Sequence, residues 1–383
     1  MKPSTFPLFS VPMSTDPDST KSPQNSPRLL SLDAFRGADM LCILGLDTFV
    51  YALAAALPQS EFLREIRMQF GHKAWDGLVL YDCIFPAFVF ISGMAMAFSF
   101  EKKRERGEGY LRMTGALLRR ALILVALGAI LQGALSFHFS ETRWASVLGL
   151  IGVANAFGGL LALFLKTPKR IALAMFGLAG TLAAAQFLGG DFTPGGSVNA
   201  KLDALLLPGK FHYGIYDPEG VLCIVSASVA VLAGYLVGLF LVGKKQEGAT
   251  WKTAGKLAAI GAGTLLLAHA AGTFYPIIKN MWTQSFVFAA VGWSLLAFVV
   301  FYALFDVLKL EKLAFFFKII GVNAIAIYVL KWIFPFKNLS ALLFGGAAEL
   351  CGIYSGCVLA VGTIALEWAL VLWLYRRKIF FKI

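Results

Sequence analysis

Apolar residues occur in ten long blocks along the chain, separated by short polar segments. A bilayer core requires about 20 consecutive apolar residues in each crossing helix. The blocks cover residues 38–57, 78–99, 115–137, 145–165, 171–189, 220–242, 257–274, 285–306, 314–335 and 355–375. The pattern predicts an all-α polytopic membrane protein with about ten transmembrane helices in one bundle and no soluble domain. A re-entrant or interfacial arrangement of 338–352 would change this count by one.

The first 27 residues differ from the rest of the chain, because they are rich in Ser, Pro and Asp and contain no apolar core. This composition is typical of disorder and lacks the apolar region of a cleaved leader. We therefore expect a disordered cytoplasmic tail over 1–27 and a transmembrane domain over 28–383.

The formal net charge of +12 comes from 34 basic and 22 acidic residues. The basic residues cluster at the ends of apolar blocks: Lys102, Lys103, Arg104, Arg106, Arg112, Lys166, Lys169, Arg170, Lys244, Lys245, Arg376, Arg377 and Lys378. Such clusters are typical of cytoplasmic helix ends and do not form a face for nucleic acid. The pattern predicts that both termini are cytoplasmic and that 58–77, 190–219 and 275–284 face outward.

Acidic residues follow one face of the first block. Asp33, Arg36 and Asp39 are three residues apart, and Asp47 continues this face about 12 Å deeper in the membrane. A charge at that depth is costly unless it contacts protein or water. The stripe either forms a network that fixes helix packing or lines a polar path into the bundle. We favour the path, because Asp47 has no basic residue within one helical turn.

The segment FGHKAWDGLVLYDC, before the second block, contains His72, Trp75, Asp76 and Asp82. If 71–77 is helical, His72 and Asp76 are one turn apart, and the carboxylate can fix the tautomer of a catalytic imidazole. Asp82 lies within the apolar run, where an isolated carboxylate is costly. A histidine at a membrane interface often serves only as a cap. The convergence of these groups makes His72 and Asp76 candidate catalytic residues, and Trp75 and Asp82 candidate substrate ligands.

Two further outward segments carry charged and aromatic residues. Asp217 and Glu219 form an acidic turn before the sixth block, where helix capping would also explain them. The second segment contains Lys279, Asn280 and Trp282. Carboxylates that pair an ammonium and an indole that stacks on a sugar ring suit a cationic, hydroxyl-rich ligand such as an amino sugar. No spacing typical of a metal site or a nucleotide-binding loop is present.

Six motifs occur in an order that resembles one known family. They are RLLSLDAFRG (28–37), HKAWDG (72–77), YDCIFPAFVFISG (81–93), DPEG (217–220), KNMWTQSF (279–286) and YRRKIFFKI (375–383). Together they resemble the transmembrane acyltransferase family of heparan-α-glucosaminide N-acetyltransferase, in its bacterial branch of largely unknown function. The resemblance implies an acetyltransferase in the bacterial inner membrane that uses cytosolic acetyl-CoA to acetylate the amine of a glucosamine-type sugar or glycan outside.

The resemblance also assigns roles to residues. It implies that His72 is the general base or a transient acetyl carrier. Asp47 stands about where the family has an asparagine, and we count it with the catalytic candidates because it could deprotonate or bind a different acceptor. The candidates for binding acetyl-CoA are Arg36, Asp39, Arg119, Arg120 and Asn323. Anchoring would also explain the arginines, and a helix–helix hydrogen bond would explain Asn323. Homodimerisation is implied by the resemblance alone.

A proton-coupled sugar or amino-sugar transporter is the alternative from another class. Intramembrane Asp39, Asp47 and Asp82 could then carry protons. A scaffold that has lost its activity is a third reading. Substitution of His72 distinguishes these readings, because it should abolish acyl transfer, whereas transport should depend more on Asp47 and Asp82.

Overall fold

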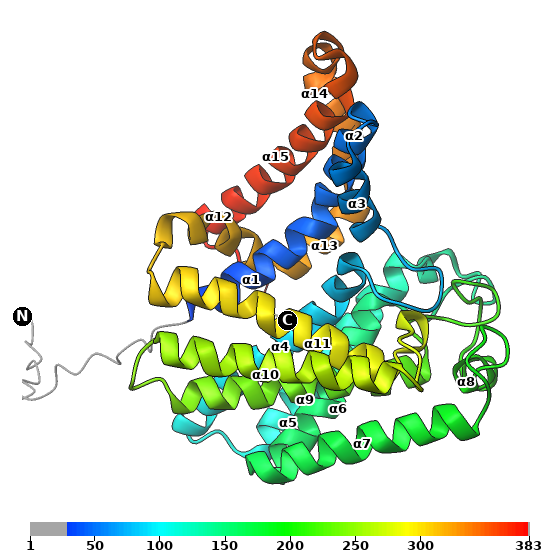
Figure 1. The fold of residues 1–383 in the computed structure, drawn as a ribbon, viewed down its shortest axis with the longest axis vertical. Helices are drawn as coiled ribbons and strands as arrows, with labels where there is room; N and C mark the ends of the chain where they lie inside the picture. The colour runs from blue at the N-terminus through cyan, green and yellow to red at the C-terminus, as the bar shows by residue number, and fades with distance from the viewer. Residues whose placement is uncertain (1–28, 382–383) are drawn as a thin grey trace, which may run out of the picture.

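The computed structural model describes residues 29–381, and the tail predicted over 1–27 lies outside this range. The described chain folds almost entirely into helices (Figure 1). In chain order these are α1 (Leu30–Leu41), α2 (Asp47–Ala56), α3 (Glu61–Gln69), α4 (Ile84–Glu105), α5 (Tyr110–Leu131), α6 (Val147–Leu165), α7 (Pro168–Leu188), α8 (Val198–Leu206), α9 (Val221–Gly243), α10 (Trp251–Gly272), α11 (Gln284–Tyr302), α12 (Glu311–Val322), α13 (Ala324–Ile333), α14 (Phe336–Leu350) and α15 (Ser355–Arg376).

Nine helical segments of the described residues are long and apolar enough to cross a membrane. The pair α12 and α13, bent by 61°, would form a tenth span. The prediction of an all-α polytopic membrane protein is confirmed. The ninth apolar block, 314–335, differs from the prediction because it is broken at Asn323. Helix α14 covers most of 338–352, and its 15 residues are too few to cross a bilayer.

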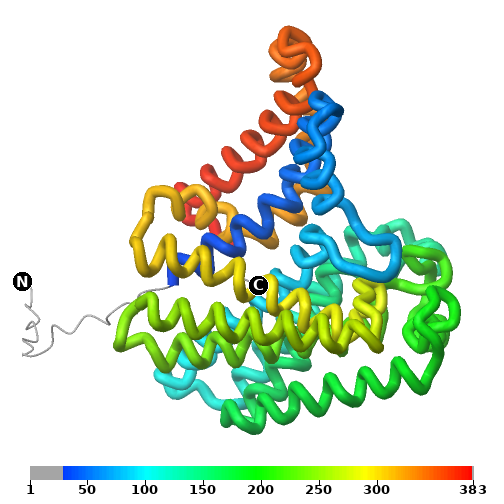
Figure 2. Tube along the Cα trace, in the orientation of Figure 1, coloured from blue at the N-terminus to red at the C-terminus, as the bar shows by residue number. Residues whose placement is uncertain are grey.

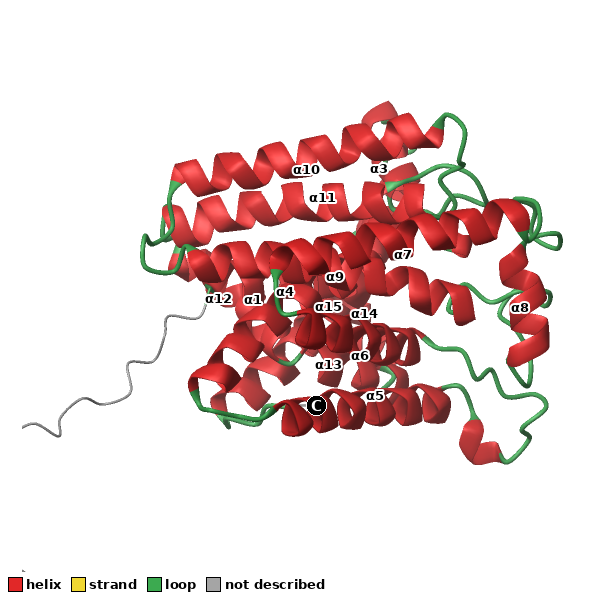
Figure 3. Ribbon diagram, turned by 90° about the horizontal axis from the view of Figure 1, so that it is seen from below, coloured by secondary structure: helices red, strands yellow, loops and turns green. Residues whose placement is uncertain are grey.

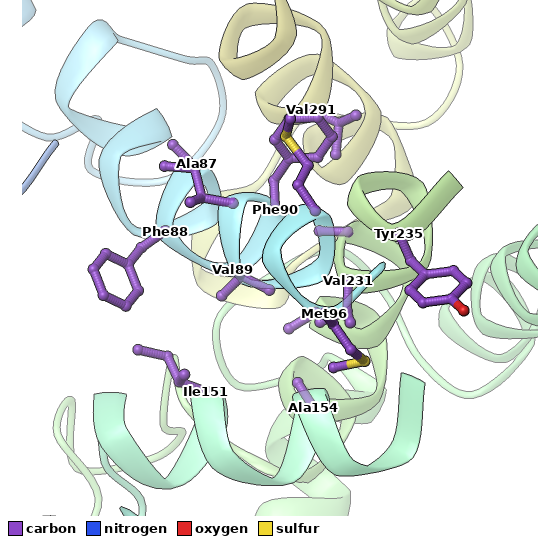
Figure 4. Close-up of a cluster of buried hydrophobic side chains, with 14 of the residues drawn as sticks. Ala87, Phe88, Val89, Phe90, Met96, Ile151, Ala154, Val231, Tyr235 and Val291 are labelled. Carbon is purple, nitrogen blue, oxygen red and sulfur yellow. The ribbon is translucent and has the colours of Figure 1, made fainter. Parts of the chain in front are cut away.

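Helix α4 lies at the centre of the main body, surrounded by α6, α9 and α11 (Figure 4). Its Val89 and Phe90 are fully buried. Gly93 lies against α9 so closely that an added Cβ would be 2.1 Å from the carbonyl oxygen of Val231. Gly234 on α9 makes the reciprocal contact with Phe90. Close backbone approach at small residues is typical of membrane helix packing.

The helices divide into a main body and an arm. Helices α4 to α7 and α9 to α11 form the body, whereas α2, α3, α14 and the adjoining end of α15 extend away from it (Figures 1 and 2). Within the body, α10 and α11 run side by side (Figure 3). Helix α1 crosses α12 at Gly37 and Gly321, where a Cβ on either glycine would overlap the facing backbone. Helix α1 also packs against α4 and α11 of the body and continues into the arm, so it connects the two.

The first span is interrupted between α1 and α2. A π-helical turn covers Cys42–Leu46, and Gly45 adopts a φ of 149° that a residue with a Cβ rarely takes. Two carbonyls of the turn receive side-chain donors from outside the helix. The Tyr81 hydroxyl donates to Cys42 over 3.4 Å, and the Lys331 ammonium donates to Ile43. The interruption therefore creates polar contacts in the middle of the first span.

The loops predicted to face outward meet at one end of the bundle. The Trp75 indole donates to the carbonyl of Phe192, and Asp76 pairs through its backbone with Ile278. The loop after α5 joins the same end, because Arg143 forms a backbone bridge with Gly209. We call this end, formed by 70–79, 132–146, 189–220 and 273–283, the loop face. It carries the candidate site.

Candidate active site

His72 and Asp82 form the centre of the loop face. The His72 Nδ1 lies 2.7 Å from Asp82 Oδ1. The Asp82 side chain is fully buried, whereas half of the His72 side chain (52%) is exposed. Asp82 sits in the short 3₁₀ turn before α4, and its Oδ2 accepts the backbone N–H of Val79 at 3.3 Å. The turn thus fixes a buried carboxylate directly behind an accessible imidazole.

Lys279 completes this centre from the other side of the loop face. Its Nζ lies 3.0 Å from Asp82 Oδ1 and 2.9 Å from His72 Nδ1. A carboxylate buried in an apolar region is costly unless it is paired and hydrogen-bonded. The Lys279 ammonium can only donate, so its hydrogen bond goes to Asp82 when Nδ1 of His72 carries a proton. In that tautomer His72 also donates to Asp82, and the lone pair of Nε2 is free. This arrangement suits a general base or a nucleophile.

Asp76 does not occupy the position predicted for it. The segment 71–77 is a loop, so the helical spacing on which the pairing of His72 with Asp76 depended is absent. Asp76 is exposed, and its backbone pairs with Ile278. Asp82, predicted as a substrate ligand, supports the imidazole instead. Its ten-residue separation from His72 matches no helical or strand period and could not be found from spacing.

Trp75 and Asn280 connect the loops around the site. Besides its hydrogen bond to Phe192, the Trp75 ring packs edge-on against Tyr216, with ring centroids 5.4 Å apart. The buried Asn280 amide donates to the Tyr216 hydroxyl over 3.1 Å. Both residues therefore lie at the loop face, where their contacts hold Tyr216.

Trp282 does not fit the predicted role of stacking on a sugar. Only 2% of its surface is exposed. Its ring packs edge-on against Phe85 and Phe286 at centroid distances of 5.5 and 5.7 Å. Trp282 is therefore a core residue beneath the loop face, and the sequence prediction for it is wrong.

Asp217 and Glu219 are already paired with a cation of the protein. Arg143 donates to the two oxygens of Asp217 over 2.7 and 2.6 Å and also contacts Glu219. Asp217 is fully buried, and Glu219 nearly so. The two carboxylates are therefore not available for the ammonium of a substrate, and the prediction that they bind one is corrected. We call Arg143, Asp217 and Glu219 the arginine latch.

The arginine latch shifts the pKa values of its members. Burial raises the pKa of the Glu219 carboxyl to about 7, because Arg143 compensates it only in part. Burial alone would raise the pKa of the Asp217 carboxyl, but the bidentate guanidinium of Arg143 holds that pKa below its usual value. Arg143 was not among the candidates predicted from the sequence. It lies between the third and fourth apolar blocks, where the ten-span arrangement also implies an outer loop. An arginine there departs from the inside-positive pattern, and it could have indicated a partner carboxylate.

An intramembrane cavity of about 410 Å³ lies next to the His72 centre. Helices α1, α4 and α11 form its walls, and Phe70, Leu80 and Tyr81 line it from the loop side. Most of the lining is apolar. Asp39 is the acidic residue of the lining, and its Oδ2 is buried without a hydrogen-bond partner in the described structure. The volume is in the range of small-molecule sites.

Tyr81 connects the cavity with the His72 centre. Its ring lines the cavity and lies 5.2 Å from the His72 ring, centroid to centroid. The Tyr81 hydroxyl donates to Asp47 Oδ2 over 3.2 Å. Asp47 thus contacts the hydroxyl group of Tyr81 and does not itself line the cavity.

The residues predicted to bind acetyl-CoA are only partly brought together. Arg120 contains a buried Nε with no hydrogen-bond partner among the described residues, and its charge lies close enough to Arg36 for repulsion. Arg36 lies one helical turn before the cavity residue Asp39, does not itself line the cavity, and pairs with Asp33 at 3.7 Å. Arg119 is exposed. Asn323 instead donates to the carbonyl of Ile379 over 3.3 Å.

The fold and this geometry define a helical membrane protein with a His–Asp–Lys centre beside an intramembrane cavity. The chain is 25% identical to the heparan-alpha-glucosaminide N-acetyltransferase of Mus musculus over 97% of its length. It is 25% identical to the enzyme of the same name from Homo sapiens over 93% of its length. These matches confirm the resemblance that the six motifs indicate. The chain spans about three fifths of the length of these relatives (63% and 60%). No protein-family model matches the chain.

Proposed function

We propose that this protein is a membrane acyltransferase that moves an acetyl group from acetyl-CoA to the amine of a glucosamine-type sugar. The observation that carries the proposal is the supported imidazole of His72, placed directly beyond one end of a ligand-sized cavity. The names of the relatives supply the reaction class and the type of acceptor.

The donor would enter at the Arg36 end of the cavity. Arginine pairs well with phosphate, and the partly buried Arg36 and Arg120 lie close enough to repel each other, so that an anion between them would be favoured. Arg36 also pairs with Asp33 at 3.7 Å. The pantetheine arm would then run along the cavity, where Asp39 can accept from an amide N–H. The thioester would reach Tyr81, next to His72. Arg119 and Asn323 have no part in this arrangement.

The orientation in the membrane follows from the charge pattern. Basic residues occupy the last turn of α4 and the first turn of α7, at the ends opposite the loop face. The inside-positive rule therefore places the loop face outside and both termini in the cytoplasm. We infer a multi-pass protein of the bacterial inner membrane, with the donor inside and the acceptor outside.

The chemistry requires one proton transfer through His72. A neutral amine attacks the thioester carbon, so that a C–N bond forms and the C–S bond breaks. Nε2 of His72 accepts the proton from the attacking nitrogen and delivers it to the departing thiolate. Asp82 holds the imidazole and balances its positive charge during the transfer. An acetyl-imidazole on Nε2, later attacked by the amine, would use the same contacts.

The test is product formation by the full chain in nanodiscs. With ¹³C-acetyl-CoA and glucosamine, the wild type should form labelled N-acetylglucosamine, followed by mass spectrometry. His72→Gln should lower the turnover number by about 10²–10⁴, the usual contribution of a general base. His269→Gln, on the exposed face of α10, is the matched control and should retain activity.

Two results would contradict the proposal. One is equal product formation by wild type and His72→Gln. The other is no product from folded wild type with several amino sugars. Uptake of an amino sugar that depends on Asp39 or Asp47 would then support the transporter.

A further inference from the structure

The cavity lining nearest the His72 centre consists of Leu80 and two aromatic residues. Phe70 and Tyr81 both line the cavity, with ring centroids 6.0 Å apart. Beyond them, the His72 ring contacts Tyr81 and does not line the cavity. We therefore expect that a thioester in the cavity reaches Nε2 of His72 when the ring of Phe70 or Tyr81 moves aside.

Tyr81 is held in this lining by its hydroxyl group. The hydroxyl donates to Asp47 Oδ2 at 3.2 Å and is 3.4 Å from the carbonyl oxygen of Cys42. Both acceptors belong to the interrupted part of the first span. Asp47 is itself fixed, because its Oδ1 accepts the backbone N–H of Thr48 at 2.6 Å. Helix interruptions of this kind often occur at functional sites.

Asp47 is connected to the cavity by its hydrogen bond to Tyr81. It is absent from the cavity lining, and its hydrogen bond to Tyr81 points toward that lining. Lys331 and Glu367 are the other charged groups near Asp47. Lys331 is engaged with the carbonyl of Ile43 in the same π-helical turn. Lys331 and Asp47 thus connect the interrupted part of the first span to its neighbours, Lys331 through Ile43 and Asp47 through Tyr81.

We propose that Tyr81 is a positioning residue that separates the donor cavity from the acceptor site, and that Asp47 holds it closed. For the identity of donor and acceptor, the inference rests on the proposed function. The separation has a chemical purpose, because water that reaches a thioester forms acetate and a free thiol and releases a proton. A closed Tyr81 keeps water from the loop face away from the thioester until the acceptor is present.

The partition can be tested without any reaction, because Cys42 lines the cavity. Cys83→Ser and Cys351→Ser remove the second cavity thiol and the exposed thiol, and Cys223 and Cys357 are buried. In this background, full-length protein in sealed liposomes is treated with a charged methanethiosulfonate that is added only on the side of the loop face. The reagent then cannot reach Cys42 through the entrance of the donor. Tyr81→Phe should raise the labelling rate of Cys42 about tenfold, as expected for the loss of one hydrogen bond to a charged group.

The controls distinguish a local effect of Tyr81 on access to the cavity from a lower stability of the whole protein. Tyr354→Phe removes the hydroxyl of an exposed tyrosine outside the cavity and should leave labelling unchanged. Asp47→Ala should raise the labelling rate of Cys42 as Tyr81→Phe does. The variant with both substitutions should be labelled little faster than either single variant. Equal labelling of wild type and Tyr81→Phe, at equal thermal stability, would overturn the proposal.

A second readout connects the partition to catalysis. Tyr81→Phe should raise acetyl-CoA hydrolysis without acceptor relative to transfer with acceptor, while the KM for acetyl-CoA changes little. A merely structural role would lower both rates together, and that result would also overturn the proposal. If the wild type has no transferase activity, the proposed function fails, and Cys42 labelling still decides whether Tyr81 separates the two spaces.

Discussion

Asp82 is the residue on which the candidate site depends most. Its carboxylate is fully buried at the start of a membrane-spanning helix. An unpaired charge there would cost several kcal/mol. His72, Lys279 and the backbone N–H of Val79 compensate it. Each of these partners is thereby held in place, and the His72 side chain is more exposed than that of Lys279 (52% against 23%).

A matched pair of substitutions tests this assignment. Asp82→Asn retains the shape of the side chain but removes the charge that steadies the imidazolium, so the turnover number should fall about 10²-fold or more. Asp76→Asn changes an exposed carboxylate in the same loop and should leave turnover close to that of the wild type. Steady-state rates in nanodiscs measure both. Equal losses would contradict the assignment of Asp82 as the support of His72.

Residue types were predicted from the sequence more successfully than residue partners. His72, Asp82 and Lys279 were each identified as candidates, and the fold brings them together. The partner of His72 was wrong because a loop has no fixed period along the sequence. The role of Asp217 and Glu219 was wrong for a related reason. A short stretch of sequence shows a carboxylate but does not show that a distant arginine already pairs it.

At the scale of elements, the arginine latch joins the loop after α5 to the turn before α9. Arg143 lies 74 residues from Asp217 in the chain. Asp203 on α8 adds a further connection, because it accepts the backbone N–H groups of Asp217 and Val221. Two acidic groups face one guanidinium in a buried place, so one of them retains a proton more readily than it would in water.

The arginine latch predicts a pH dependence of stability. The pKa of Glu219 rises from 4.5 to about 7 on folding. Between these values the folded protein binds more protons than the unfolded chain, so the free energy of unfolding contributed by Glu219 falls as pH rises. Glu219→Gln should therefore reduce the decline in melting temperature between pH 5 and 8, measured in detergent.

Other groups near the arginine latch titrate in the same window. Burial raises the pKa of Asp203 to about 6 and lowers that of His212. Both groups are present in wild type and in Glu219→Gln, so the difference between the two curves isolates Glu219. Parallel curves for the two proteins would show that Glu219 is ionised throughout this range and would contradict the prediction.

The helices themselves could be predicted well, because a bilayer imposes a length and an apolar composition on each span. The interruptions within these helices could not be predicted from the sequence. Gly45 allows the break in the first span, but an isolated glycine within an apolar run gives no such indication. The bend at Asn323 likewise depends on contacts with a distant part of the chain, the carbonyl of Ile379.

At the scale of the whole molecule, the proposed parts follow one another across the membrane. Arg36 and Asp39 lie on α1, the cavity continues between α1, α4 and α11, and Tyr81 leads to His72 at the loop face. The basic helix ends lie opposite that face. This sequence of sites across the membrane predicts that donor and acceptor approach from opposite sides and meet at His72.

Vectorial transfer in sealed vesicles tests this claim most directly. Acetyl-CoA is added only outside inverted vesicles that contain glucosamine, so that the donor meets the face that is cytoplasmic in cells. We expect N-acetylglucosamine to accumulate inside the vesicles with wild-type protein and not with His72→Gln. Product that forms only when both substrates are on the same side would contradict the account.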